Sequence, residues 1–212
     1  GDVNLSVIDK YADWIASTPI KGVFVCGTTG EFSSLTIDER KLILEKWLVS
    51  ARKRFKVIAH VGSNCQRSAM ELARHAAQVG ADAIASIAPS FFKPGTVDEL
   101  VDFFAPICHS AAGLPFYYYN MPSITGVNLP VDKFLVEGKK KIPNLVGTKF
   151  THNNLMEMGV CIELEQHRFE VLHGYDEILI SGLAMGAVAG VGSTYNYIPN
   201  VYQAIFDSMK MN

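Results

Sequence analysis

Short apolar segments alternate with helical patterns along the whole chain, and this alternation constrains the fold more than any other feature. Seven segments are almost continuously hydrophobic and rich in β-forming residues: 22–27, 56–62, 81–89, 115–120, 145–150, 169–174 and 187–192. Continuous hydrophobicity, as opposed to strict polar alternation, is typical of parallel strands that are covered on both faces. The sequence therefore predicts seven parallel strands with helices between them.

Helix-boundary residues stand in the segments between these strands. Two pairs fit the capping box, in which side chains at both ends satisfy free backbone N–H groups: Thr36 with Glu39 and Thr96 with Glu99. Gly80 and Gly113 stand where glycines are expected to end helices, just before the next strand. Pro130 suits the first turn of a helix. Each predicted strand is thus followed by a predicted helix.

The order of the elements favours a barrel over an open sheet. A helical face precedes the first strand, formed by Ile8, Tyr11, Ala12 and Ile15. Repeated βα units give right-handed crossovers and a parallel sheet. No glycine-rich dinucleotide turn follows the first strand, which argues against a doubly wound sheet. We expect a single α/β domain over residues 1–212, a (β/α)8 TIM barrel that lacks its first strand and its C-terminal helices.

Composition excludes several classes of function. The 212 residues carry a net charge of −2, so no electrostatic footprint for nucleic acid or for an anionic membrane surface is present. No apolar run approaches the roughly 18 residues of a membrane span. The four cysteines show no CxxC pairing, which favours a reducing, cytoplasmic setting. The six histidines show no HExxH-like spacing, so we expect no metal site.

Lys149 stands near the end of a predicted strand, where an apolar side chain would be usual. One interpretation is a lysine that extends its ammonium group to solvent, which is the commoner case on spacing alone. The other is a buried amine whose pKa is lowered by its apolar surroundings, leaving a neutral nucleophile toward carbonyls. In a barrel the functional side chains lie at such strand ends, which keeps the second interpretation open.

Three other segments at strand ends have two interpretations each. "GTTGE" (27–31) is either a strand-to-helix turn or a cradle for a carboxylate, in which Thr28 and Thr29 supply hydroxyls. "YYYN" (117–120) is either an aromatic strand that fills the core or the source of a proton-carrying tyrosine. In "HGYDE" (173–177) the acids either cap a helix or recognise the hydroxyls of a polyol.

The segments "GTTGE", "YYYNMP", "GTKF" and "GSTYN", in this order, resemble the pyruvate-dependent class I aldolase superfamily of N-acetylneuraminate lyase and dihydrodipicolinate synthase. The resemblance covers essentially the whole chain. It implies that Lys149 forms an imine with the C2 carbonyl of pyruvate and that no other cofactor is needed. It also implies that Tyr119 transfers a proton, and that Thr28 and Thr29 hold the pyruvate carboxylate.

Within that superfamily, the chain departs from the synthase branch. The synthase branch is expected to have an arginine where this chain has Ile124, and tyrosines where it has Phe91 and Phe92. The lyase branch instead matches at "HGYDE", at "GSTYN" and at a hydroxyl two residues after the lysine. The resemblance implies that five residues bind the hydroxylated tail of a sialic acid: Thr151, Gly174, Asp176, Glu177 and Ser193.

The implied activity is the reversible cleavage of N-acetylneuraminate to N-acetyl-D-mannosamine and pyruvate, by a cytoplasmic homotetramer. Two alternatives remain open. The same imine chemistry could act on another 2-keto-3-deoxy sugar acid. A truncated barrel could instead have lost catalysis and serve as a binding or assembly subunit.

Overall fold

Seven parallel strands form one sheet in the computed structural model, which describes residues 2–111 and 113–210. The spatial order is the chain order, β1 to β7. The strands are β1 (Gly22–Val25), β2 (Lys56–His60), β3 (Ala83–Ile87), β4 (Phe116–Asn120), β5 (Leu145–Phe150), β6 (Glu170–His173) and β7 (Ala189–Gly190). All seven predicted strands are confirmed, although β7 is shorter than its apolar segment.

A helix precedes β1, and helices follow every strand, as predicted. The α-helices are α1 (Val7–Ala16), α2 (Ile37–Ala51), α3 (Gln66–Gln78), α4 (Val97–His109), α5 (Pro122–Thr125), α6 (Val131–Lys141), α7 (Leu155–Glu163), α8 (Leu179–Ala184) and α9 (Pro199–Lys210). Short 3-10 helices are η1 (Phe32–Ser34), η2 (Asp176–Ile178) and η3 (Thr194–Asn196). Within residues 2–111 and 113–210, no helix combines the length and apolarity needed to cross a membrane.

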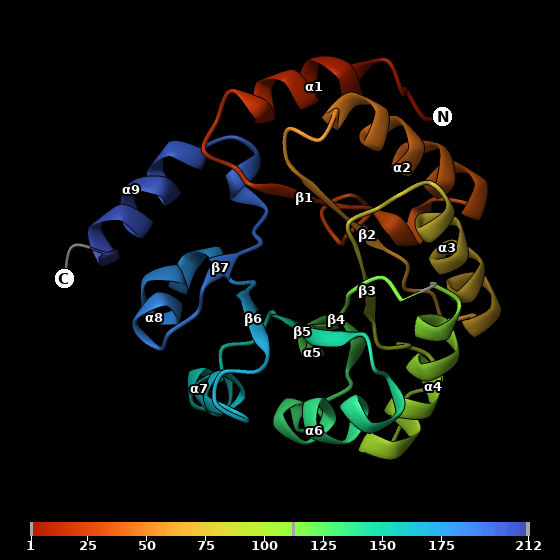
Figure 1. Ribbon diagram of the computed structural model, residues 1–212, viewed down its shortest axis with the longest axis vertical. Coiled ribbons are helices and arrows are strands. Elements are labelled where there is room, and N and C mark those ends of the chain that lie inside the picture. Colours follow the sequence, from red (N-terminus) through yellow and green to blue (C-terminus); the bar gives the residue numbers. More distant parts are fainter. Residues whose placement is uncertain (1, 112, 211–212) are drawn as a thin grey trace.

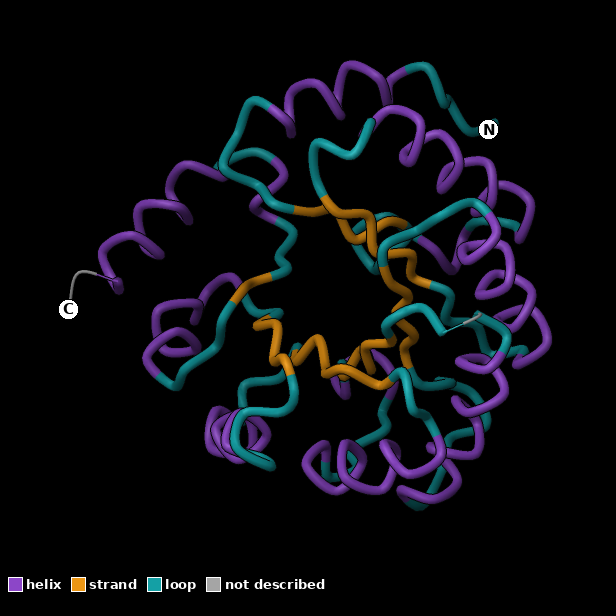
Figure 2. The backbone as a smooth tube through the Cα atoms, viewed as in Figure 1, coloured by secondary structure: helices purple, strands orange, loops and turns teal. Residues whose placement is uncertain are grey.

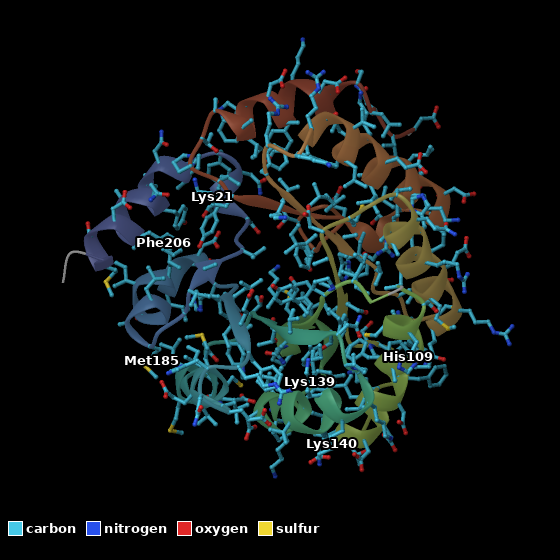
Figure 3. The ribbon with its side chains drawn as sticks, viewed as in Figure 1. Lys21, His109, Lys139, Lys140, Met185 and Phe206 are labelled. Atoms are coloured by element: carbon cyan, nitrogen blue, oxygen red, sulfur yellow. The ribbon has the colours of Figure 1, made fainter. Side chains whose placement is uncertain are left out.

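The strands form a curved inner wall, and the helices surround it (Figures 1 and 2). Most of the buried apolar side chains lie between the sheet and these helices, including Phe104, Phe116 and Phe134. A smaller buried set, which includes Tyr117 and Leu172, packs inside the curve of the sheet. Figure 3 shows side chains reaching into the space that the sheet encloses. This arrangement of seven βα units is a partial (β/α)8 barrel, as predicted.

The helix-boundary predictions are confirmed with two local corrections. The capping box of Thr36 and Glu39 is complete, and Gly80 and Gly113 have φ angles of +83° and +84°. Of the second predicted capping box, Thr96 with Glu99, only one of the two hydrogen bonds is present. Thr96 accepts from the Glu99 N–H at 3.2 Å, but the Glu99 carboxylate accepts from the Gly95 N–H instead of the Thr96 N–H. Pro130 caps α6 and so lies one residue before its first turn.

The sheet stays open between β7 and β1, because no strand in the described residues pairs with both of these edges. Side chains bridge this opening, which we call the seam. The Thr29 and Ser193 hydroxyls lie 2.5 Å apart, joining the loop after β1 to the loop after β7. Tyr11 in α1 donates a hydrogen bond to the Asn196 side chain in η3. The seam is therefore closed by side-chain hydrogen bonds and not by strand pairing.

Candidate active site

Lys149 lies inside the curved sheet at the C-terminal end of β5, and only 7% of it is exposed. Its Nζ atom lies 3.9 Å from the centre of the Tyr119 ring and 4.6 Å from the centre of the Phe24 ring. No carboxylate among the described residues lies within ion-pair distance of this amine. The interpretation of Lys149 as a solvent-exposed lysine is therefore wrong.

These apolar surroundings determine the charge of the amine. Burial lowers the pKa of Lys149 to about 7, and the negative charge of Asp176 opposes that shift. A large fraction of the amine is therefore neutral near pH 7, whereas an exposed lysine is almost fully protonated there. Only the neutral form has the free electron pair that attacks a carbonyl carbon.

Tyr119 lies beside the lysine because β4 and β5 pair with Tyr119 opposite Lys149. Its hydroxyl lies 3.0 Å from the Thr28 Oγ1 atom and donates to the Met121 Sδ atom at 3.1 Å. Burial raises the pKa of Tyr119, and the hydrogen bond with Thr28 opposes this rise. The neighbouring Tyr118 points the other way and packs against Phe134, as the alternation of a strand requires. One tyrosine of the three thus reaches the lysine at the strand end.

The loop after β1 is supported by two buried residues, His60 and Arg40. The Cys26 residue that begins this loop has a left-handed φ of +55°, which is unusual for a residue other than glycine. Its carbonyl oxygen lies 2.7 Å from His60 Nδ1, while the Ile87 N–H donates to Nε2. Burial lowers the pKa of His60 well below its usual value, so this ring is a neutral, satisfied core histidine.

Arg40, from α2, completes this support. Its guanidinium donates to the carbonyl of His60 at 2.7 Å and to that of Gly62 at 2.8 Å, and the residue is buried. These bonds fix the end of β2 next to the loop that carries Thr28 and Thr29. Thr28 is half-buried and faces Tyr119, whereas Thr29 is exposed and faces Ser193.

Thr151 and Gly174 form a tight contact at the ends of β5 and β6. Thr151 is buried, and its Oγ1 atom has no hydrogen-bond partner among the described residues. A Cβ atom at Gly174 would lie 1.9 Å from that oxygen, so only glycine fits there. The Gly174 N–H donates to the Phe150 carbonyl at 2.8 Å, which continues the β5–β6 pairing past the strand ends.

Asp176 and Glu177 share η2 but have different surroundings. Asp176 accepts from the Thr194 N–H at 2.7 Å and from the Thr194 hydroxyl at 2.6 Å through Oδ2. Its Oδ1 atom is buried and has no partner in the described part of the chain. Glu177 is exposed, and no described side chain bonds to it. The structure thus brings Asp176 to the seam beside Ser193 and leaves Glu177 at the rim.

A recess of about 370 Å³ opens at the same end of the sheet, between the loops after β4, β5 and β6. Polar side chains dominate its lining, and none of them is a carboxylate. The lining residues are Pro122, Ser123, Gly126, Asn128, His152, Asn153 and Tyr175. No group of three or more His, Cys, Asp or Glu side chains in the described ranges is placed to hold a metal ion.

Sequence reasoning missed four residues that shape this site: Phe24, Arg40, His60 and Met121. Phe24 could have been found, because strand alternation places it inside the sheet two residues before Cys26. His60 ends an apolar segment, so its place at a strand end could be predicted, but its support of the loop after β1 could not. Arg40 and Met121 carry no sequence signal, since their role depends on which loops meet in space.

Comparisons with known proteins show which family the chain resembles in sequence and fold. The family model described as "Dihydrodipicolinate synthetase family" matches residues 1–211. The N-acetylneuraminate lyase of Gallus gallus is 46% identical over 201 residues, which are 93% of this chain and 65% of that protein. The chain spans 63–65% of the length of the curated relatives that it matches first.

Solved structures give the same result. The Proteus mirabilis N-acetylneuraminate lyase superposes with a TM-score of 0.97 at 36% identity, covering 100% of this chain and 71% of that one. The Ruminococcus gnavus sialic acid aldolase, solved as a catalytic lysine mutant, superposes with a TM-score of 0.94 at 28% identity, covering 100% of this chain and 68% of that one. By its fold and its sequence, this chain belongs to the dihydrodipicolinate synthetase family.

Proposed function

We propose that this chain carries the active site of a Schiff-base aldolase that reversibly cleaves N-acetylneuraminate to N-acetyl-D-mannosamine and pyruvate. The observation that carries the proposal is the buried Lys149 amine with a pKa of about 7, placed 3.9 Å from the centre of the Tyr119 ring. The relatives named as N-acetylneuraminate lyases and the aldolase solved as a catalytic lysine mutant support it.

The first step joins the substrate to the protein. The neutral Lys149 amine attacks the C2 carbonyl of the open-chain sugar acid, and loss of water leaves an iminium ion. Thr28 and Thr29 hold the adjacent carboxylate through hydroxyl and backbone N–H groups. The loop that carries them has its start fixed by His60 and Arg40, so the carbonyl is presented to the amine in one orientation.

The second step breaks the carbon–carbon bond. The C4 hydroxyl gives its proton to the Tyr119 oxygen as Tyr119 passes its own hydroxyl proton to the carboxylate held beside it by Thr28. The C3–C4 bond breaks, and its electron pair moves into the iminium to give an enamine. The C4 carbon leaves as the aldehyde of N-acetylmannosamine. Protonation of the enamine at C3 and hydrolysis of the imine then release pyruvate and the free amine. The proposed reaction requires no metal and no external cofactor.

The hydroxylated tail is assigned to the rim residues. Thr151, Gly174, Asp176, Glu177 and Ser193 surround the loops after β5, β6 and β7. Asp176 keeps one unpartnered oxygen, and the Glu177 carboxylate is free of described contacts, so both can accept hydrogen bonds from sugar hydroxyls.

Borohydride reduction in the presence of pyruvate tests the imine. We expect a stable adduct on Lys149, found by peptide mass mapping, and none in Lys149→Arg, whose guanidinium stays protonated. A folded protein without any adduct on Lys149 would refute the aldolase proposal and favour a binding subunit.

Substrate comparison tests the sugar. We expect N-acetylneuraminate to be cleaved faster than other 2-keto-3-deoxy sugar acids. Glu177→Gln should raise the KM for sialic acid while the yield of pyruvate trapping stays the same. Equal losses in both measurements would reject a role for Glu177 in holding the tail.

Location and assembly complete the proposal. The four free cysteines support a reducing compartment, which we take to be the cytoplasm. We propose a homotetramer on the basis of family resemblance, and light scattering of the purified protein tests it.

A further inference from the structure

The Met121 thioether touches the proposed proton carrier directly. The Tyr119 hydroxyl donates to Met121 Sδ at 3.1 Å, and the Thr28 Oγ1 atom lies 3.7 Å from the same sulfur. A thioether sulfur carries no hydrogen and can only accept, and only weakly. The hydroxyl proton of Tyr119 therefore points at a weak acceptor. A substrate oxygen can readily replace the sulfur as the acceptor of this hydrogen bond.

The backbone around Met121 keeps this contact in place. Met121 directly follows β4 and caps α5. Its carbonyl accepts from the N–H and from the hydroxyl of the buried Thr125, both at 3.1 Å. The Met121 residue is only half-buried, so a small oxidant can reach it. A half-buried methionine whose sulfur lies at a fixed position beside Tyr119 is a candidate modification site.

We propose that Met121 is an oxidation-sensitive positioning residue for Tyr119, and that its conversion to the sulfoxide by a peroxide slows the carbon–carbon step. In this conversion the peroxide O–O bond breaks, one oxygen bonds to sulfur, and the other leaves as water. The sulfur is oxidised by two electrons and the peroxide is reduced. The inference rests on the proposed function, because it assumes that Tyr119 transfers a proton.

The sulfoxide changes both the strength and the shape of the contact. Its oxygen is a strong hydrogen-bond acceptor on a polar, chiral group. It would retain the Tyr119 proton, so proton exchange with the sugar hydroxyl would slow. Lys149 has no described contact with Met121, and its attack on pyruvate should proceed as before.

The test treats the full chain with hydrogen peroxide and then with a thiol, which reverses the oxidation of the exposed Cys65 but leaves methionine sulfoxide. Mass mapping should find one added oxygen on Met121. Since general acid–base catalysis contributes about a hundredfold or more, we expect kcat for cleavage to fall at least about tenfold. The KM and the yield of pyruvate trapping should stay constant, and methionine sulfoxide reductase should restore kcat.

Two variants make the test specific. Met121→Leu is a substitution of nearly equal volume, and this variant should cleave the substrate at the same rate before and after peroxide treatment. Met156→Leu, which removes a methionine of α7 that is 78% exposed, should remain as sensitive as the parent chain.

Three results would overturn the proposal. They are an equal loss of activity in Met121→Leu, sulfoxide on Met121 without a fall in kcat, and no sulfoxide on Met121 when Met156 is fully oxidised. If the untreated protein traps no pyruvate, the proposed function itself fails. Trapping with an unaltered kcat after oxidation instead rejects only the role of Met121.

Discussion

Lys149 has the aromatic rings of Tyr119 and Phe24 beside its amine, and the negative charge of Asp176 lies beyond ion-pair distance. This combination places the pKa of Lys149 at about 7. The charge of this one side chain therefore changes within the physiological pH range, which an exposed lysine does not do. Any chemistry that needs the neutral amine must follow that titration.

We expect the rate of borohydride trapping with pyruvate to rise with pH through about 7 and then to level off, because the amine must lose its proton. Asp176→Asn removes the charge that raises the pKa of Lys149, so the midpoint should move to lower pH. Glu177→Gln, a change at the exposed neighbour, should leave the midpoint in place. Equal midpoints in the parent chain and Asp176→Asn would contradict this electrostatic account.

Gly174 is a residue of the site that has no room for a side chain. Gly174→Ala would place a Cβ atom 1.9 Å from Thr151 Oγ1 and 2.8 Å from Thr151 Cβ. Overpacking of this kind costs about 1–3 kcal/mol, which urea unfolding can measure. Adding Thr151→Ala should recover part of that loss, since it removes the nearest atom. A double variant no more stable than Gly174→Ala would show that the strain lies elsewhere.

At the level of elements, α2 contributes to the site without reaching it. Arg40 extends from this helix to the end of β2 and donates to two buried carbonyls there. Burial lowers the pKa of this guanidinium, and no carboxylate among the described residues pairs with it. The helix therefore holds a strand end, and through His60 the loop after β1, by hydrogen bonds without an ion pair.

Arg40→Leu should lower the free energy of unfolding by about 2–4 kcal/mol, because the carbonyls of His60 and Gly62 lose their donors. Arg40→Lys keeps a donor for one carbonyl, so its free energy of unfolding should fall less than that of Arg40→Leu. Urea unfolding of both variants checks the order. Equal stability of Arg40→Leu and the parent chain would mean that removing the buried charge offsets the lost hydrogen bonds.

The order of strands and helices could be predicted from the sequence, because burial on both faces leaves continuous apolar segments that local patterning reveals. Lys149 and Tyr119 could be placed at neighbouring strand ends for the same reason. The N–H group that donates to the Glu99 carboxylate could not be predicted, since Gly95 and Thr96 both offer a free N–H within reach. The contact of Met121 with Thr28 could not be predicted either, because it depends on the loop after β1 meeting the end of β4 in space.

For the whole molecule, the seam between β7 and β1 is where the first and last parts of the chain meet. The hydrogen bond between Tyr11 in α1 and Asn196 in η3 joins these parts. Few backbone bonds hold this part of the sheet, because β7 spans two residues. We therefore expect η3 and α9 to open locally before the rest of the barrel.

Tyr11→Phe removes the hydroxyl of that bond and keeps the ring against Trp47. Hydrogen exchange of η3 and α9 amides should become several-fold faster, by the roughly 1 kcal/mol that a hydrogen bond contributes. Amides of α3 and α4 should exchange as before. Tyr197→Phe, at a ring that is 66% exposed, serves as the matched control. Uniformly faster exchange would instead mean that the whole fold is weakened.

The short contact between Thr29 and Ser193 has a consequence for how this molecule responds to its substrate. One hydroxyl belongs to the loop proposed for the carboxylate, the other to the loop proposed for the sugar tail, and they come from opposite edges of the sheet. A sugar acid bound by both loops would link the two open edges of the sheet. A higher concentration of the sugar acid would then raise the free energy needed to open the seam. Pyruvate alone, bound on one side of the seam, would not raise it.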